Sequence, residues 1–270
     1  METATSRDGT PIAYWRSGSG PPLLLVHGAT AAHDTTWRIV GPLLAERHTV
    51  YAMDRRGRGG SGDTAPYHLQ REAEDVAAVV DAVALATGGP VDVLGHSYGG
   101  LSALEAALLT PHIGRLILYE SVPLRGAGLY PPGIAERLEA LLEAGDVEGA
   151  LVTMYRDLVE MPPEEIEMLR AQRDAWETRL ANVPSMPREL RAEQAYVFLP
   201  ERFRAMRAPT LLLVGEDSPP REHDNARGVA AGLRDARVTI LPGQQHAAMY
   251  MAPDLFVAEV LRFLAGQETP

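Results

Sequence analysis

The sequence contains the stretch Val91-Asp92-Val93-Leu94-Gly95-His96-Ser97-Tyr98-Gly99-Gly100-Leu101, in which an apolar run passes through a glycine-rich corner into an amphipathic segment. The apolar run predicts a buried strand, and Leu101 opens a predicted helix. Between them stands a G-x-S-x-G pattern, which places a serine on a tight strand-to-helix corner. The Ser97 hydroxyl would then stand above a sheet at a helix N-terminus, where free N–H groups favour developing negative charge. The pattern therefore predicts a nucleophilic serine.

Short apolar runs of the same kind recur along the chain and alternate with amphipathic stretches. The expected strands are 23–26, 49–53, 91–94, 116–119, 210–214 and 238–241, and the expected helices are 37–47, 71–86, 101–109, 221–233 and 255–264. Nearly continuous apolar runs suit parallel strands that are covered on both faces. The alternation predicts an α/β fold with a mostly parallel, doubly wound sheet. The segment 4–16, with a turn at Asp8-Gly9, predicts an antiparallel edge hairpin.

The alternation breaks after Glu120. Residues 124–206 contain no convincing buried strand, and their pattern predicts helices over 134–142, 147–159 and 164–180, separated by breaks such as Met161-Pro162-Pro163. We therefore expect a helical cap, inserted between two sheet strands and acting as a mobile lid. The expected domains are a core of residues 1–123 and 207–270 and a cap of residues 124–206.

A nucleophilic serine needs a base, and His246 is the candidate. It follows the last expected strand in Leu241-Pro242-Gly243-Gln244-Gln245-His246. A loop there would bring the imidazole over the sheet edge that carries Ser97, in the chain order serine, acid, histidine. The other histidines show neither H-E-x-x-H nor H-x-x-E-H spacing, so no metal site is expected.

Together these motifs resemble the α/β-hydrolase-fold enzymes with a helical cap, over nearly the whole chain. His27-Gly28 is similar to the oxyanion-loop motif of that family, and Asp54-Arg55-Arg56-Gly57-Arg58-Gly59-Gly60-Ser61 is similar to its D-x-R-G-x-G-x-S turn. The resemblance implies a serine hydrolase that works through an acyl-enzyme. It also implies that the backbone N–H groups of Ala29 and Tyr98 stabilise the oxyanion.

Two carboxylates compete for the role of triad acid. The acid of the family usually follows the strand at 211–214 as G-x-x-D, but here Ser218 holds that place and Asp217 comes one residue early. Glu120 ends the strand 116–119, where certain dehalogenases of the family carry the acid. Either carboxylate could orient the imidazole if it reaches the ring. Both remain candidates, with a slight preference for Glu120 because it requires no register slip.

The expected pocket is apolar. Met154 and Trp176 of the cap, together with Met249 and Tyr250 near His246, are the expected substrate contacts. Such a lining favours uncharged esters or lactones of small apolar substrates. Two alternatives remain at this point: hydrolysis of a carbon–carbon bond in a diketone on the same triad, and a non-catalytic ligand receptor on the same fold.

The composition narrows the classes of protein further. The chain has 270 residues, 46% of them hydrophobic, which is enough for one sizeable core. A net charge of −11 argues against a general nucleic-acid binder or a polybasic membrane protein. The absence of cysteine excludes disulfides, cysteine-ligated metals and thiol catalysis.

The remaining expectations concern cofactors, partners and location. The segment Gly57–Gly62 fits G-x-G-x-x-G, but a loop follows where a dinucleotide fingerprint needs a helix, so no cofactor is expected. No apolar run approaches ~18–20 residues, and the N-terminal residues are polar, so we expect a cytoplasmic protein that binds neither membrane nor nucleic acid. The expected partner is a small-molecule substrate, and the sequence leaves the choice between monomer and homo-oligomer open.

Overall fold

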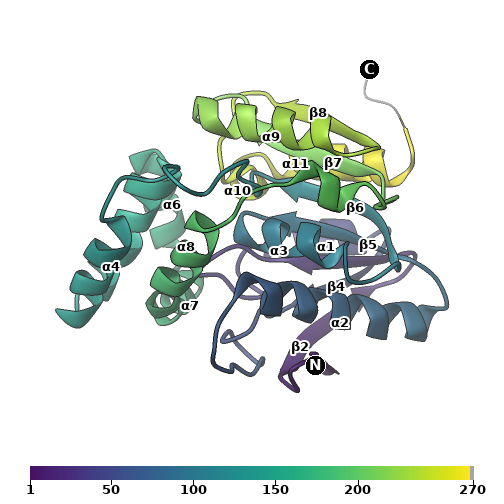
Figure 1. The fold of residues 1–270 in the computed structure, drawn as a ribbon, viewed down its shortest axis with the longest axis horizontal. Coiled ribbons are helices and arrows are strands. Elements are labelled where there is room, and N and C mark those ends of the chain that lie inside the picture. The colour runs from purple at the N-terminus through teal and green to yellow at the C-terminus, as the bar shows by residue number, and fades with distance from the viewer. Residues whose placement is uncertain (268–270) are drawn as a thin grey trace.

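A computed structural model describes residues 1–267 and shows one sheet with helices on both faces (Figure 1). The sheet has eight strands in the order β1-β2-β4-β3-β5-β6-β7-β8. They are β1 (Glu2–Thr5), β2 (Pro11–Gly18), β3 (Pro22–Val26), β4 (Thr49–Met53), β5 (Val91–His96), β6 (Ile113–Tyr119), β7 (Thr210–Gly215) and β8 (Ala236–Leu241). The pairs β1–β2 and β2–β4 are antiparallel and the other pairs are parallel, which confirms the predicted sheet and its edge hairpin.

Both faces of the sheet are buried, which explains why its strands are apolar at successive positions. One face is covered by α1 (Val40–Ala45) and α11 (Pro253–Leu264), and the other by α2 (Leu69–Thr87), α3 (Tyr98–Ala106) and α9 (Pro220–Gly232). In β3, Leu23 and Leu25 join the cluster on the first face, whereas Leu24 and Val26 join the cluster on the second. This alternation follows from the two-residue period of a strand.

Segment 124–206 is helical and contributes no strand to the sheet. Its helices are α4 (Ile134–Glu143), α5 (Val147–Thr153), the π-helix η1 (Met154–Val159), α6 (Pro163–Ala171), α7 (Arg173–Asn182), the short η2 (Val183–Ser185), α8 (Met186–Gln194) and η3 (Pro200–Phe203). Helices α4, α6, α7 and α8 gather at one side of the sheet (Figure 1). They enclose an apolar cluster of their own, which includes Leu138, Leu151 and Leu190. The division into core and cap, and the mobility of the cap, stay predictions.

The helices of this segment differ in detail from the expected ones. The helix expected over 147–159 changes from α to π at Met154. The helix expected over 164–180 is interrupted at Gln172, whose ψ of 74° lies outside the helical region. Helix α8 was not expected, because charged residues such as Glu189 and Arg191 leave few apolar positions to reveal its period. No helix within residues 1–267 is both long and apolar enough to span a bilayer.

Buried ion pairs tie the turn after β4 to two helices. Arg55 Nη2 lies 2.8 Å from Glu72 Oε1 on α2 and 3.1 Å from Glu189 Oε1 on α8. Arg58 also pairs with Glu189. Arg55 and Arg58 therefore anchor this turn, and Glu189 joins segment 124–206 to it.

Candidate active site

Ser97 occupies a strained corner between β5 and α3. Its backbone has φ 52° and ψ −131°, a conformation that costs of order 1–3 kcal/mol and is found mostly at functional sites. Close backbone packing holds the corner in place. A Cβ atom built on Gly95 would lie 2.4 Å from Gly100 Cα, and one built on Gly99 would lie 2.2 Å from the carbonyl oxygen of His27. Gly95 and Gly99 are therefore required, because any side chain at these positions would overlap neighbouring backbone atoms.

Gly99→Ala should destabilise the protein by about 1–3 kcal/mol, because its Cβ would overlap backbone atoms that cannot rotate away. The expected fall in Tm is several degrees, at roughly 2–4 °C per kcal/mol for a chain of this size. Gly89→Ala is the matched control, since nothing lies within 4 Å of its Cβ position. Equal melting temperatures for the two variants would contradict the packing argument.

The loop after β3 lies against Ser97 and is held by a buried histidine. A Cβ atom on Gly28 would lie only 3.0 Å from Ser97 Cβ. His27 Nδ1–H donates to the carbonyl oxygen of Gly28 at 2.8 Å, while His27 Nε2 accepts the backbone N–H of Arg55 at 3.1 Å. Burial lowers the pKa of His27, so it stays neutral and keeps this pattern of hydrogen bonds. The next residue, Ala29, lines the cavity beside Ser97.

Tyr98 lines the same cavity from another element. Tyr98 is the first residue of α3, so its N–H has no acceptor within the helix. Its side chain is fixed by the hydroxyl of Tyr67 at 2.8 Å and by the Arg55 guanidinium, 4.6 Å from the ring centre. Ala29, in the loop after β3, and Tyr98, at the start of α3, therefore border one cavity, an arrangement that can present two N–H groups to an oxyanion.

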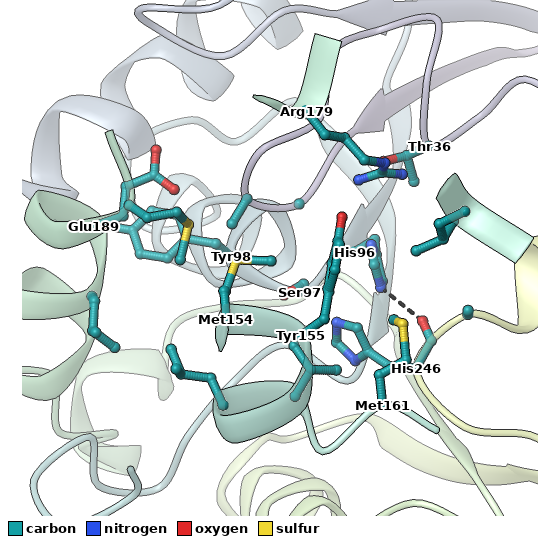
Figure 2. Close-up of a pocket in the computed structure, with 18 of the residues that line it drawn as sticks. Thr36, His96, Ser97, Tyr98, Met154, Tyr155, Met161, Arg179, Glu189 and His246 are labelled. Atoms are coloured by element: carbon teal, nitrogen blue, oxygen red, sulfur yellow. Dashed lines mark hydrogen bonds between the residues drawn. The ribbon is translucent and has the colours of Figure 1, made fainter. Parts of the chain in front are cut away.

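The loop that carries His246 is held by groups at the ends of β5 and β6. His96 Nε2 donates to the backbone oxygen of His246 at 3.1 Å (Figure 2). The hydroxyl of Tyr119 donates to the backbone oxygen of Gln245 and accepts the N–H of Ala248 at 3.2 Å. His96 is neutral because burial holds its pKa well below the ordinary value. These contacts turn the imidazole of His246 toward the Ser97 side of the sheet.

Glu120 meets His246 across this loop. His246 Nδ1 lies 2.8 Å from Glu120 Oε2, and the Glu120 side chain is only 1% exposed. The other oxygen, Oε1, accepts the N–H of Gly215 at 2.8 Å and the hydroxyl of Ser218 at 2.5 Å. Burial opposes protonation of His246. The hydrogen bond and charge of Glu120, together with the charges of Glu222 and Glu165, outweigh this effect and raise the pKa of His246 above its ordinary value.

Asp217, the competing carboxylate, lies elsewhere. Its side chain is exposed, and its backbone N–H donates to the carbonyl oxygen of Gln244 at 2.9 Å. The structure therefore does not bring Asp217 to the imidazole. Ser218, at the place where the family usually has its acid, instead donates to Glu120. Sequence reasoning missed this role, and the only signal for it was a hydroxyl in place of the expected carboxylate.

One cavity lies between the carboxyl ends of the strands and segment 124–206 (Figure 2). Ser97 and His246 line it from the sheet side, and Met154 and Tyr155 from the helical side. The cavity has an open volume of about 70 Å³. The cavity therefore fits a small substrate, at the sheet edge where open parallel sheets bind ligands.

The lining of the cavity matches the expected substrate contacts only in part. Met154, Met249 and Tyr250 line it, but Trp176 does not. Trp176 is buried among the helices of segment 124–206, with its ring 6.2 Å from that of Tyr155. The lining is also less apolar than expected, because it includes three charged side chains, Arg179, Glu189 and Glu193.

The mostly parallel sheet, with a serine at the corner between β5 and α3, defines the class of α/β hydrolases. A model of the alpha/beta hydrolase family matches residues 23–259. The chain belongs to this family, and the protein is an enzyme of the hydrolase type.

Similar proteins cover nearly the full chain. An alpha/beta hydrolase of Sphaerobacter thermophilus has a solved structure that is 34% identical, with a TM-score of 0.81 over 97% of this chain and 100% of that one. The pimeloyl-[acyl-carrier protein] methyl ester esterase of Nitrosospira multiformis is 26% identical over 91% of this chain and 95% of its own length. The 2-hydroxy-6-oxo-6-(2'-aminophenyl)hexa-2,4-dienoic acid hydrolase of Metapseudomonas resinovorans is 25% identical over 98% and 91%.

Proposed function

We propose that this protein hydrolyses carboxylic esters or lactones of small substrates through an acyl-enzyme, with Ser97 as nucleophile, His246 as base and Glu120 as acid. The observation that carries the proposal is the 2.8 Å contact between His246 Nδ1 and Glu120 Oε2, beside a cavity that Ser97 and His246 both line. A carboxylate at this distance keeps Nδ1 protonated and leaves Nε2 free to accept a proton.

The chemistry runs in two halves. Ser97 Oγ attacks the carbonyl carbon of the ester while its proton passes to His246 Nε2, and the N–H groups of Ala29 and Tyr98 stabilise the oxyanion. Collapse of this intermediate breaks the ester bond, and the leaving alkoxide takes the proton from His246. A water molecule then attacks the acyl-enzyme, and His246 accepts its proton. Collapse of this second intermediate breaks the bond to Ser97 Oγ, which takes the proton back from His246 as the carboxylic acid leaves.

A second candidate is hydrolysis of a carbon–carbon bond in a diketone on the same residues. It is favoured by the relative from Metapseudomonas resinovorans, whose name gives a 2-hydroxy-6-oxo-dienoic acid as its substrate. The ester proposal is favoured by the relative from Nitrosospira multiformis, which is named as a methyl ester esterase. Both reactions use the same nucleophile and base, so only a comparison of substrates can distinguish the two candidates.

A panel of substrates tests the proposal. It contains p-nitrophenyl esters of increasing acyl length, several lactones and one vinylogous diketone. We expect turnover of short esters or lactones, together with covalent labelling of Ser97 by a fluorophosphonate, which reacts only with an activated serine. Turnover of the diketone alone would move the assignment to the second candidate. No turnover and no labelling would refute both.

A further inference from the structure

Arg179 is a buried cation in the wall of the candidate active site. Its side chain lies on α7, is 6% exposed, and lines the same cavity as Ser97 and His246 (Figure 2). No ion pair links it to a carboxylate within residues 1–267, where its polar partners are tyrosines. Arginine is almost never this buried without an acidic partner, because a desolvated charge is costly. The cavity therefore contains a positive charge that the protein itself does not neutralise.

The tyrosine contacts orient Arg179 without balancing its charge. Arg179 Nη2 donates to the hydroxyl of Tyr250 at 2.8 Å, and this hydroxyl donates in turn to the backbone oxygen of Thr35 at 2.6 Å. Burial alone would lower the pKa of Arg179, but Tyr155 and Tyr250 keep it above the ordinary value. The guanidinium has five N–H donors, and the hydroxyls of Tyr250 and Tyr155 use only part of them.

A purely structural role does not account for this charge, because α7 is anchored by other residues. At one end of the helix, Arg38 donates to both carboxylate oxygens of Asp174 at 2.9 and 3.0 Å. At the other end, Asn182 Nδ2 donates to the backbone oxygen of Thr30 at 3.1 Å. These contacts hold both ends of the helix to the segment between β3 and α1, so the charge of Arg179 is not needed for that purpose.

The two acidic side chains of the cavity do not balance Arg179 either. Glu189 is paired with Arg55 and Arg58, and Figure 2 shows it well separated from Arg179 across the cavity. Glu193 accepts the hydroxyl of Tyr130 at 3.0 Å, and burial raises its pKa to about 7, so it is partly protonated at neutral pH. The positive charge of Arg179 is therefore not neutralised by either acidic side chain of the cavity.

We propose that Arg179 binds a carboxylate of the substrate, so that the preferred substrates are small esters or lactones that carry a free carboxylate. This inference rests on the proposed function, and it replaces the expectation of an uncharged substrate. A guanidinium fork binds a carboxylate through two charge-assisted hydrogen bonds, which are stronger beside a buried guanidinium than in water. An uncharged substrate of the same size would leave Arg179 desolvated and unpaired.

The test compares matched substrates that differ only in charge. One arm uses monomethyl esters of dicarboxylic acids of four to seven carbons, each beside its analogue with a carboxamide in place of the carboxylate. The other arm carries the charge on the alcohol side, as 4-acetoxybutyrate beside 4-acetoxybutyramide. We expect kcat/KM to favour the carboxylate at least tenfold in one arm. In Arg179→Gln this preference should fall by about 10- to 100-fold, toward one.

The controls separate recognition from folding. Arg173→Gln removes an exposed arginine from the same helix and should keep the wild-type preference. Arg179→Lys retains a point charge without the fork and should keep part of the preference. A structural defect would lower turnover of the carboxylate and the carboxamide by the same factor, leaving their ratio unchanged. That result, or a wild type that shows no preference in either arm, would overturn the inference.

A binding measurement distinguishes failure of this inference from failure of the proposed function. Calorimetry with succinate, glutarate, adipate and pimelate requires no turnover. We expect at least one of these dicarboxylates to bind the wild type at least tenfold more tightly than it binds Arg179→Gln. If no ester is hydrolysed but this difference is found, the ester function fails and the carboxylate site stands. Equal binding, or no binding to either protein, would refute the site.

Discussion

Ser97→Ala is expected to lower kcat for p-nitrophenyl acetate by at least about 10⁴-fold while leaving the fold intact. Without Oγ no acyl-enzyme can form, and the remaining groups supply only the modest catalysis of a preformed oxyanion site. Ser97 is partly exposed at the cavity rather than packed in the core, so its loss should leave the melting temperature within a few degrees of the wild type. Thermal melting and circular dichroism provide the control for folding. Residual kcat above a few per cent of wild type would rule out Ser97 as the nucleophile.

His246→Ala should reduce kcat by nearly as much, because the base and the nucleophile act as one unit. The double variant should then be no slower than either single variant. Kinetics on the same ester for all three proteins test this expectation. If the two losses multiply instead, the residues contribute independently and the shared proton transfer is wrong.

The Ser97 corner, the buried strands and the edge hairpin could be predicted from the sequence, because each depends on residues that are close together in the chain. The corner at Ser97 depends on glycines within five residues of one another, and its strand and helix flank it directly. The strands could be located because burial on both faces makes them apolar at successive positions, as in β3. The edge hairpin followed from its turn at Asp8-Gly9.

The contacts between distant segments followed from the sequence only in part, because it left both Glu120 and Asp217 open as partners of His246. Glu120 and His246 lie 126 residues apart, and their meeting depends on the direction in which two loops leave the sheet. Glu120 itself has φ 42°, a backbone conformation that no propensity predicts for glutamate. The hydroxyl of Ser218 then donates to its carboxylate from the end of β7.

Side chains of segment 124–206 were the hardest to assign. Trp176 and Arg179 stand three residues apart on α7, yet the first packs among the helices and the second lines the cavity. The sequence contains 25 basic residues, all of them arginine. Only the packed structure shows which arginine is buried without a carboxylate. The apolar residues expected to line the pocket therefore favoured an uncharged substrate.

Glu120→Gln is expected to lower kcat by up to about 10⁴-fold with KM nearly unchanged, because the imidazole loses its orientation and the stabilisation of its cation while the pocket stays intact. Glutamine keeps the size of the side chain. It removes the largest of the contributions that raise the pKa of His246, so the acidic limb of the kcat/KM profile should move to lower pH. In the wild type this activity should rise with pH through a midpoint above the ordinary histidine value, since only neutral His246 accepts the proton.

Asp217→Asn is the matched control, with the same loss of charge at the competing carboxylate. Its side chain is exposed, and its backbone hydrogen bond to Gln244 does not depend on the carboxylate. We therefore expect kcat within about threefold of wild type and an unshifted acidic limb, as for most surface substitutions. Steady-state kinetics from pH 5 to 9 on both variants, with the same p-nitrophenyl ester, provide the comparison. A large loss in Asp217→Asn beside a small loss in Glu120→Gln would assign the acid to Asp217, and small losses in both would leave a Ser97–His246 dyad as the catalytic unit.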